Sequence, residues 1–136
     1  MVIQILSVIV MKSKILTVLS AIFGLLLINS GLNKYFQYIP VPEGLPEEVV
    51  KDNAALMEIQ WLIPLVGLAE IIGGLLLIFP KTRALGALIV FPVMVGVLLT
   101  HIFVAPAGLP IALALWAILL WILFENRRKY TPLIGN

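Results

Sequence analysis

The chain has 136 residues, of which 62% are hydrophobic and 12% are charged, and it contains no cysteine. Soluble domains are usually about 45–50% apolar and about 25% charged, so this chain carries more apolar surface than a globule of its size can bury. Its mean hydropathy of +1.14 indicates a polytopic membrane protein, and we expect one domain over residues 1–136. A net charge of +2 is too small to indicate a nucleic-acid partner.

Four apolar segments are long enough to cross a bilayer as helices, which takes about 17–25 mostly apolar residues. None alternates polar with apolar residues as a half-buried strand would. We therefore expect an all-α, four-helix transmembrane bundle with spans at about 15–32, 61–79, 84–104 and 107–124. Pro80 follows the second span, while Pro64 and Pro110 fit the first turns of the second and fourth. Pro92 lies within the third span, where we expect a kink.

Lysine and arginine residues lie mostly on one side of these spans. Only Lys34 and Lys51 lie on the far side, whereas seven lie on the near side, namely Lys12, Lys14, Lys81, Arg83, Arg127, Arg128 and Lys129. By the positive-inside rule, both termini are expected in the cytoplasm. The long connection at 35–60 is then exposed on the outer side of the membrane.

That outer connection contains three prolines and a glycine at 40–48, which indicate a turn. A helical run from Pro46 to Glu58 follows, with Val50, Ala54 and Met57 on one face. We expect a short amphipathic helix lying on the outer membrane surface, between the first and second spans.

The first residues have two interpretations. Met11-Lys12-Ser13-Lys14 before the first span is typical of a natural start with a positive n-region, so residues 1–10 are expected to come from an upstream start codon. A cleaved signal peptide is the alternative, but the small-x-small cleavage pattern is missing.

Glu70 is the residue least compatible with exposure to lipid. It lies about 14 Å into the second span at 1.5 Å per residue, and an ionised group at a helix centre costs about 2.5–3.5 kcal/mol to insert. Gly67, Gly73 and Gly74 flank the same face, so another helix can approach it closely. We expect Glu70 to point into the bundle, either as a functional group or as a structural residue that fixes helix packing.

Four more polar residues are expected in the outer half of the membrane with Glu70. Asn29, Asn33 and Lys34 end the first span, and His101 lies near the outer end of the third. Their clustering predicts a polar pocket that opens outward and can bind a small polar head group or carry a proton. The alternatives stay open that His101 is a satisfied interface residue and that Lys34 snorkels to the membrane surface.

Several kinds of chemistry have no pattern in this sequence. It contains no Gly-rich phosphate loop, no metal-ligand spacing and no nucleophile beside a base. One histidine excludes haem held by two histidines of one chain. The sequence therefore gives no evidence for a metal, haem, flavin or nucleotide site, and the isolated chain is not expected to be an autonomous enzyme.

Four stretches nevertheless look familiar: Ser30 to Phe36, Glu70 to Gly74, His101 to Pro110 and Asn126 to Ile134. Together they resemble the DoxX/DoxD-like family of small bacterial integral membrane proteins, and the stretch from His101 to Pro110 is the most specific of them. The resemblance covers about residues 12–134. It implies a four-helix, multi-pass protein of the bacterial inner (cytoplasmic) membrane.

The resemblance also implies a function, because the family takes its name from a subunit linked to thiosulfate:quinone oxidoreduction. This chain would then be a subunit of a quinone-linked redox or electron-transfer assembly, with quinone as ligand and a redox protein as partner. The family brings no agreed catalytic residues, so Glu70, His101, Asn29, Asn33 and Lys34 are candidates from the residues alone. The lack of cysteine argues against a thiol-based role unless a partner supplies the thiol.

Two other functions remain open. The chain can be a non-enzymatic scaffold or assembly factor, in which polar residues hold the bundle together and the outer amphipathic helix docks a partner or a second copy. It can also be a small transporter or lipid-binding protein that uses Glu70 and His101 as a relay. An internal cavity that reaches Glu70 would favour the redox and transport functions over the scaffold.

Overall fold

The computed structural model describes residues 1–135, and within that range it contains helices and no strand. The helices are α1 (Val2–Phe36), α2 (Glu47–Glu58), α3 (Leu62–Ile78), α4 (Arg83–Phe103), η1 (Pro106–Gly108), α5 (Leu109–Glu125), α6 (Arg127–Tyr130) and η2 (Thr131–Ile134). The predicted all-α fold class is confirmed. The predicted limits of the second, third and fourth spans agree with α3, α4 and α5 to within two residues.

Three stretches are long and apolar enough to cross a membrane, namely α1, α4 and the segment Pro106–Glu125 that contains α5. The fourth candidate is α3 taken with α2, and these two helices meet at 95°. The 17 residues of α3 extend about 25 Å at 1.5 Å per residue. The chain therefore supplies three or four candidate spans.

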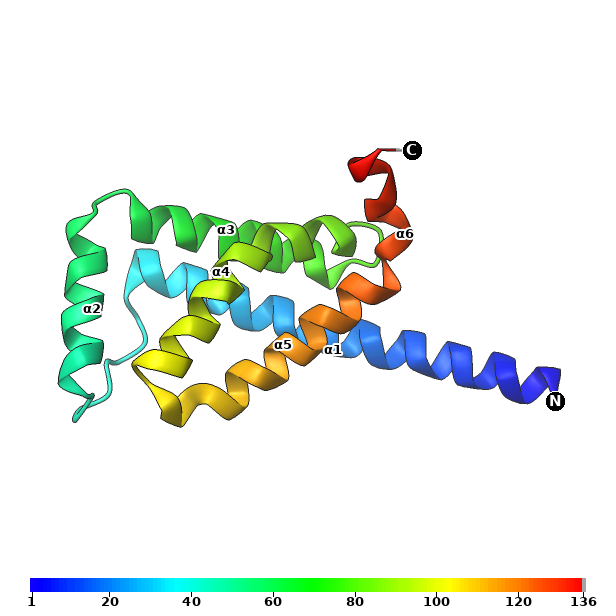
Figure 1. The fold of residues 1–136 in the computed structure, drawn as a ribbon, viewed down its shortest axis with the longest axis horizontal. Coiled ribbons are helices and arrows are strands. Elements are labelled where there is room, and N and C mark those ends of the chain that lie inside the picture. Colours follow the sequence, from blue (N-terminus) through cyan, green and yellow to red (C-terminus); the bar gives the residue numbers. More distant parts are fainter. Residues whose placement is uncertain (136) are drawn as a thin grey trace.

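The long helices pack around one apolar core. α1 packs mainly against α3, α3 against α4, α4 against α5, and α5 returns to α1 (Figure 1). The core draws on all of them, through fully buried Phe23, Leu77, Val90, Leu119 and Ile122. Both termini lie at one end of the molecule, and α2 lies across the other end (Figure 1).

Glycines bring α1 and α3 into backbone contact. A Cβ atom added at Gly31 would lie 2.5 Å from the carbonyl oxygen of Gly67, and one added at Gly74 would lie 2.5 Å from that of Gly24. The two pairs are seven residues apart on each helix, so they recur on the same face after about two turns. This confirms for Gly67 and Gly74 the close helix approach that the glycines around Glu70 predicted, with α1 as the approaching helix, whereas Gly73 faces Val90 and Gly86 of α4.

The turn between α3 and α4 is closed by Arg83, which is only 5% exposed. Its Nε donates a hydrogen bond to the carbonyl oxygen of Leu77 at 3.1 Å. Since the last carbonyls of a helix have no partner within it, this guanidinium satisfies the end of α3. Arg83 is one of the near-side cations counted in the sequence, and the structure buries its side chain at this turn.

α1 is much longer than its predicted span of about 15–32. Its 35 residues correspond to about 52 Å at 1.5 Å per residue, and its N-terminal part extends beyond the other helices (Figure 1). Every residue from Met1 to Ile15 is exposed. Apolar residues such as those at 2–11 satisfy their backbone groups best by continuing the helix, so the helix does not begin at the predicted limit.

The predicted amphipathic helix is present as α2, one residue shorter than expected at its start. Glu47 and Glu48 occupy its first turn, where carboxylates interact favourably with the helix dipole. None of its residues is fully buried. α2 therefore lies across the end of the molecule with little burial.

α4 continues as one helix from Arg83 to Phe103, with Pro92 inside it.

Candidate functional site

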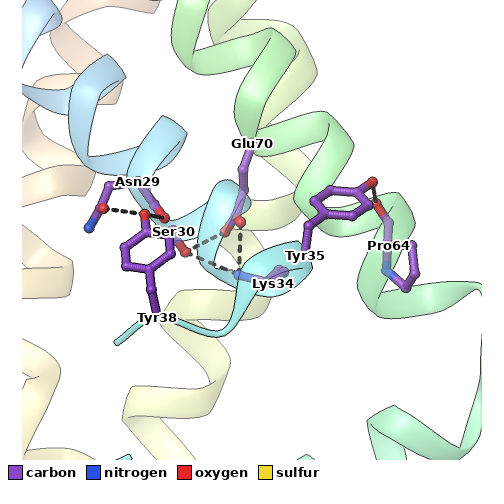
Figure 2. A network of polar contacts seen from close by, with 7 residues as sticks. All are labelled: Asn29, Ser30, Lys34, Tyr35, Tyr38, Pro64 and Glu70. Carbon is purple, nitrogen blue, oxygen red and sulfur yellow. Dashed lines mark hydrogen bonds and ion pairs between the residues drawn. The ribbon is translucent and has the colours of Figure 1, made fainter. Parts of the chain in front are cut away.

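Lys34 and Glu70 form an ion pair between α1 and α3 (Figure 2). The Nζ atom of Lys34 lies 2.8 Å from Oε2 of Glu70. The hydroxyl of Ser30 donates to Oε1 of Glu70 at 3.2 Å and accepts a hydrogen bond from Lys34 Nζ at 3.0 Å. Both carboxylate oxygens are therefore bonded, and we call Ser30, Lys34 and Glu70 the α1–α3 polar cluster.

Helix geometry explains why these three side chains meet. Ser30 and Lys34 are four residues apart and lie on one face of α1. Side chains lean toward the N-terminus of their helix, so Lys34 leans into the molecule, whereas Glu70 leans toward the α2 end. The two helices run in opposite directions, and the contact at Gly31 and Gly67 holds them close enough for a direct ion pair.

The cluster is unevenly buried. The side chain of Glu70 is 5% exposed and that of Lys34 is 24% exposed, so the lysine is the member of the ion pair that can be reached from outside. Removing one partner of a buried ion pair typically costs about 3–5 kcal/mol, because the other charge is left without compensation. The predicted direction of Glu70, into the bundle, is confirmed, and Lys34 pairs with Glu70 instead of snorkelling to the surface.

Lys34 retains hydrogen-bonding capacity. An ammonium group has three N–H donors, and within residues 1–135 its hydrogen bonds go to Ser30 and Glu70. The remaining donor and the partial exposure of the lysine make it the part of the cluster that can contact a polar ligand.

Asn29 and Asn33 bond elsewhere, at the turn that follows α1. The hydroxyl of Tyr38 lies within hydrogen-bonding distance of both oxygens of Asn29 (Figure 2), and Oδ1 of Asn33 accepts from the backbone N–H of Ile39 at 2.8 Å. Gln37 ends the helix in the left-handed conformation, with φ of 50°. The two asparagines therefore stabilise the chain reversal and do not meet Glu70.

His101 also has a local partner. Its Nδ1 lies 2.9 Å from the carbonyl oxygen of Ala105, and its ring covers Gly108, where an added Cβ atom would lie 2.3 Å from His101 Cε1. The histidine thus shapes the turn between α4 and α5. Of the predicted candidates, the structure joins Lys34 with Glu70 and gives Asn29, Asn33 and His101 other partners.

Ser30 is the member of the cluster that sequence reasoning did not select. Its position four residues before Lys34 was the available signal, because the two must share a helix face. Which helix faces Glu70 cannot be read from one sequence, however, and the bridging role of Ser30 depends on that pairing.

The surface hollows of the described residues include two that lie away from the cluster. One lies along the exposed start of α1, and the other lies between α2 and the end of α4. Glu70 lines neither of them. Within the described range, no three histidine, aspartate or glutamate side chains come together as metal ligands.

The apolar helices, the buried ion pair between two of them and the apolar outer surface define a multi-pass integral membrane protein. The family comparison is more specific, because the sequence model of the DoxX family matches residues 15–103. The chain belongs to the DoxX family. No curated protein and no solved structure matches it significantly. The match includes Ser30, Lys34, Glu70 and His101, whereas the stretch after Phe103 and the tail at 126–134 lie outside it.

Proposed function

We propose that this DoxX-family protein is the membrane subunit of a quinone-linked redox assembly and that the α1–α3 polar cluster receives the quinone head group. The observation that carries the proposal is the Lys34–Glu70 ion pair, one member of which remains partly exposed. A charged pair inside an apolar bundle costs desolvation energy, and intramembrane ionisable residues generally mark ligand or proton pathways.

The chemistry of the cluster suits a quinone. The spare N–H donor of Lys34 can bond a quinone carbonyl oxygen, and the carboxylate of Glu70 can accept or return a proton through Ser30. Reduction of a quinone consumes electrons as well as protons, so a redox protein partner supplies the electrons. The chain itself binds the head group and holds the proton at Glu70 or Lys34.

The proposed topology has four spans, with α3 as the second, both termini in the cytoplasm and α2 on the outer surface of a bacterial inner membrane. Two features support it. The termini lie at one end of the molecule and α2 lies at the other (Figure 1), and seven of the nine lysines and arginines lie on the terminal side of the spans. The cluster is then close to the outer surface, since Lys34 lies in the last turn of α1.

Thermal unfolding of the purified chain in detergent, with and without ubiquinone-1, tests this function. We expect ubiquinone-1 to raise the melting temperature of the wild type, because a ligand that binds only the folded state stabilises it. Lys34→Met and Ser30→Ala should reduce the shift. Lys51→Met, at an exposed position on α2, removes the same positive charge outside the cluster and should leave the shift unchanged. A wild-type melting temperature unaffected by the quinone would overturn the proposal.

A non-enzymatic scaffold is the second candidate, and one observation favours it. Both oxygens of Glu70 are already bonded within the chain, as expected of a residue whose work is to hold α1 to α3. In that case Glu70→Gln lowers the melting temperature while no quinone shifts it, and mild crosslinking captures a partner protein or a second copy at α2.

The third function, a transporter or lipid-binding protein with a relay from Glu70 to His101, has less support. In residues 1–135 the hydrogen bonds of Glu70 go to Ser30 and Lys34 and that of His101 goes to Ala105. A relay between them would need further groups. Proton flux in liposomes that is lost in both Glu70→Gln and His101→Asn would support the transporter function.

A further inference from the structure

A groove of about 360 Å³ separates α2 from the end of α4. One wall is a single face of α2, formed by Val49, Asp52 and Leu56 among others, and the opposite wall consists of Thr100 and Val104. The α2 positions recur at intervals of three and four, so they share one helical face. The volume falls within the range of about 300–1,000 Å³ that is typical of small-ligand sites.

The face of α2 that borders this groove is incompletely covered. Leu56 is 41% exposed and Ile59 is 42% exposed, although both point toward the rest of the molecule. Aliphatic side chains at the edge of a water-filled groove gain stability when an apolar group covers them. A ligand with an apolar part therefore fits the groove.

The charge of the groove indicates which polar group the ligand carries. Asp52 is the one ionisable residue that lines it. Within residues 1–135, Asp52 forms no ion pair, and the nearest cation along the helix, Lys51, is paired with Glu47 at 3.1 Å. Asn53 and Thr100 complete the lining, and the Thr100 hydroxyl, which donates to the carbonyl oxygen of Gly96 at 2.9 Å, can still accept a hydrogen bond. A cationic group with hydrogen-bond donors complements this set.

In the proposed topology, the groove lies at the level of the outer membrane surface. Thr100 and Val104 mark the last turn and the end of a candidate span, and α2 crosses the same end of the molecule (Figure 1). Lipid head groups occupy this level, with their acyl chains beside α4. An occupant from the surrounding leaflet can therefore enter sideways without crossing the bundle.

We propose that the groove between α2 and α4 binds a phospholipid with a primary ammonium head group, of the phosphatidylethanolamine type. The ammonium group lies at Asp52, the polar linkage lies near Asn53 and Thr100, and the start of the acyl chains covers Leu56, Ile59 and Val104. This lipid fixes α2 against the bundle. The site is separate from the α1–α3 polar cluster, and its occupation does not depend on quinone binding.

Native mass spectrometry of the full chain in detergent tests the proposal, with phosphatidylethanolamine and phosphatidylglycerol added in parallel. We expect the wild type to retain the ammonium lipid in preference to the anionic one. Asp52→Asn should weaken the ammonium lipid about two- to fivefold, the range of a partly exposed charge pair. Glu48→Gln changes the same charge on α2 outside the groove and should bind as the wild type does.

Leu56→Trp provides a second variant, because the larger side chain fills the groove and should displace the lipid while α2 stays folded, as circular dichroism would show. Equal or tighter binding of phosphatidylglycerol by the wild type would overturn the proposal. So would unchanged ethanolamine-lipid binding in Asp52→Asn. Loss of lipid binding with an intact quinone-induced melting shift would confirm that the two sites are independent.

Discussion

The α-carbons of Gly31 and Gly67 face each other so closely that a methyl group on Gly31 would lie 2.5 Å from the Gly67 carbonyl oxygen. This contact is between backbones, so neither side can move away without shifting a helix. It holds α1 against α3 one residue from Ser30 and three from Glu70. The polar cluster therefore depends on two residues that have no side chain.

Gly31→Ala should destabilise the protein by about 1–3 kcal/mol, the usual range for overpacking a well-filled contact. Gly96→Ala is the matched control, since a Cβ atom at Gly96 meets nothing within 4 Å. Gly96 is exposed in the middle of α4, so alanine there should be neutral or stabilising by up to about 1 kcal/mol. Thermal unfolding in detergent would show the difference, and equal effects would contradict the backbone contact.

The Lys34–Glu70 pair should behave as a unit in a double-mutant cycle. Lys34→Met and Glu70→Leu alone should each cost about 3–5 kcal/mol, because each leaves an uncompensated charge. The double variant should lose less than the sum of the two, since it removes both charges. Additive losses in chemical unfolding would mean that the two charges do not interact.

Tyr130 tests the attachment of the C-terminal segment. Its hydroxyl donates to the carbonyl oxygen of Ala84 at 2.8 Å, so Tyr130→Phe should cost about 0.5–1.5 kcal/mol, the value of an ordinary hydrogen bond. Burial raises the pKa of the Tyr130 hydroxyl in the folded state above its usual value of 10.0. Folding therefore favours the protonated form.

The sign of this shift sets its pH dependence. The stabilisation from Tyr130 is complete below pH 10 and is lost as the pH rises through the higher pKa of the folded state. Unfolding measured from pH 8 to 11.5 should show a steeper alkaline decline in the wild type than in Tyr130→Phe. Parallel declines would assign the alkaline sensitivity to other groups.

His101 should be dispensable for quinone binding. The structure places its ring at the turn between α4 and α5, where it bonds Ala105 and covers Gly108. His101→Asn should lower stability by about 0.5–1.5 kcal/mol through the lost hydrogen bond, yet keep the melting shift with ubiquinone-1. If the variant folds as the wild type does but shows no melting shift with ubiquinone-1, His101 takes part in quinone binding.

Hydropathy predicted the helices well, because lipid demands apolar runs whose length is fixed by the bilayer. Glu70 was predicted to face inward for the same reason, helped by its neighbouring glycines. The partner of Glu70 was not predictable, since a lysine at a helix end can extend outward or inward with equal ease. Asn33 and His101 share a depth with Glu70, but depth says nothing about direction around a helix, and both side chains serve turns instead.

Arg83 has one role during membrane insertion and another in the folded protein. In the proposed topology, the guanidinium is a positive charge that helps retain the loop between α3 and α4 in the cytoplasm during insertion. In the folded protein, the same group is buried and donates a hydrogen bond to the carbonyl oxygen of Leu77. Lysine at this position would preserve the positive charge but lack the planar, several-donor geometry of arginine. Membrane insertion therefore depends on the charge of this side chain, and folding depends on its hydrogen-bonding geometry.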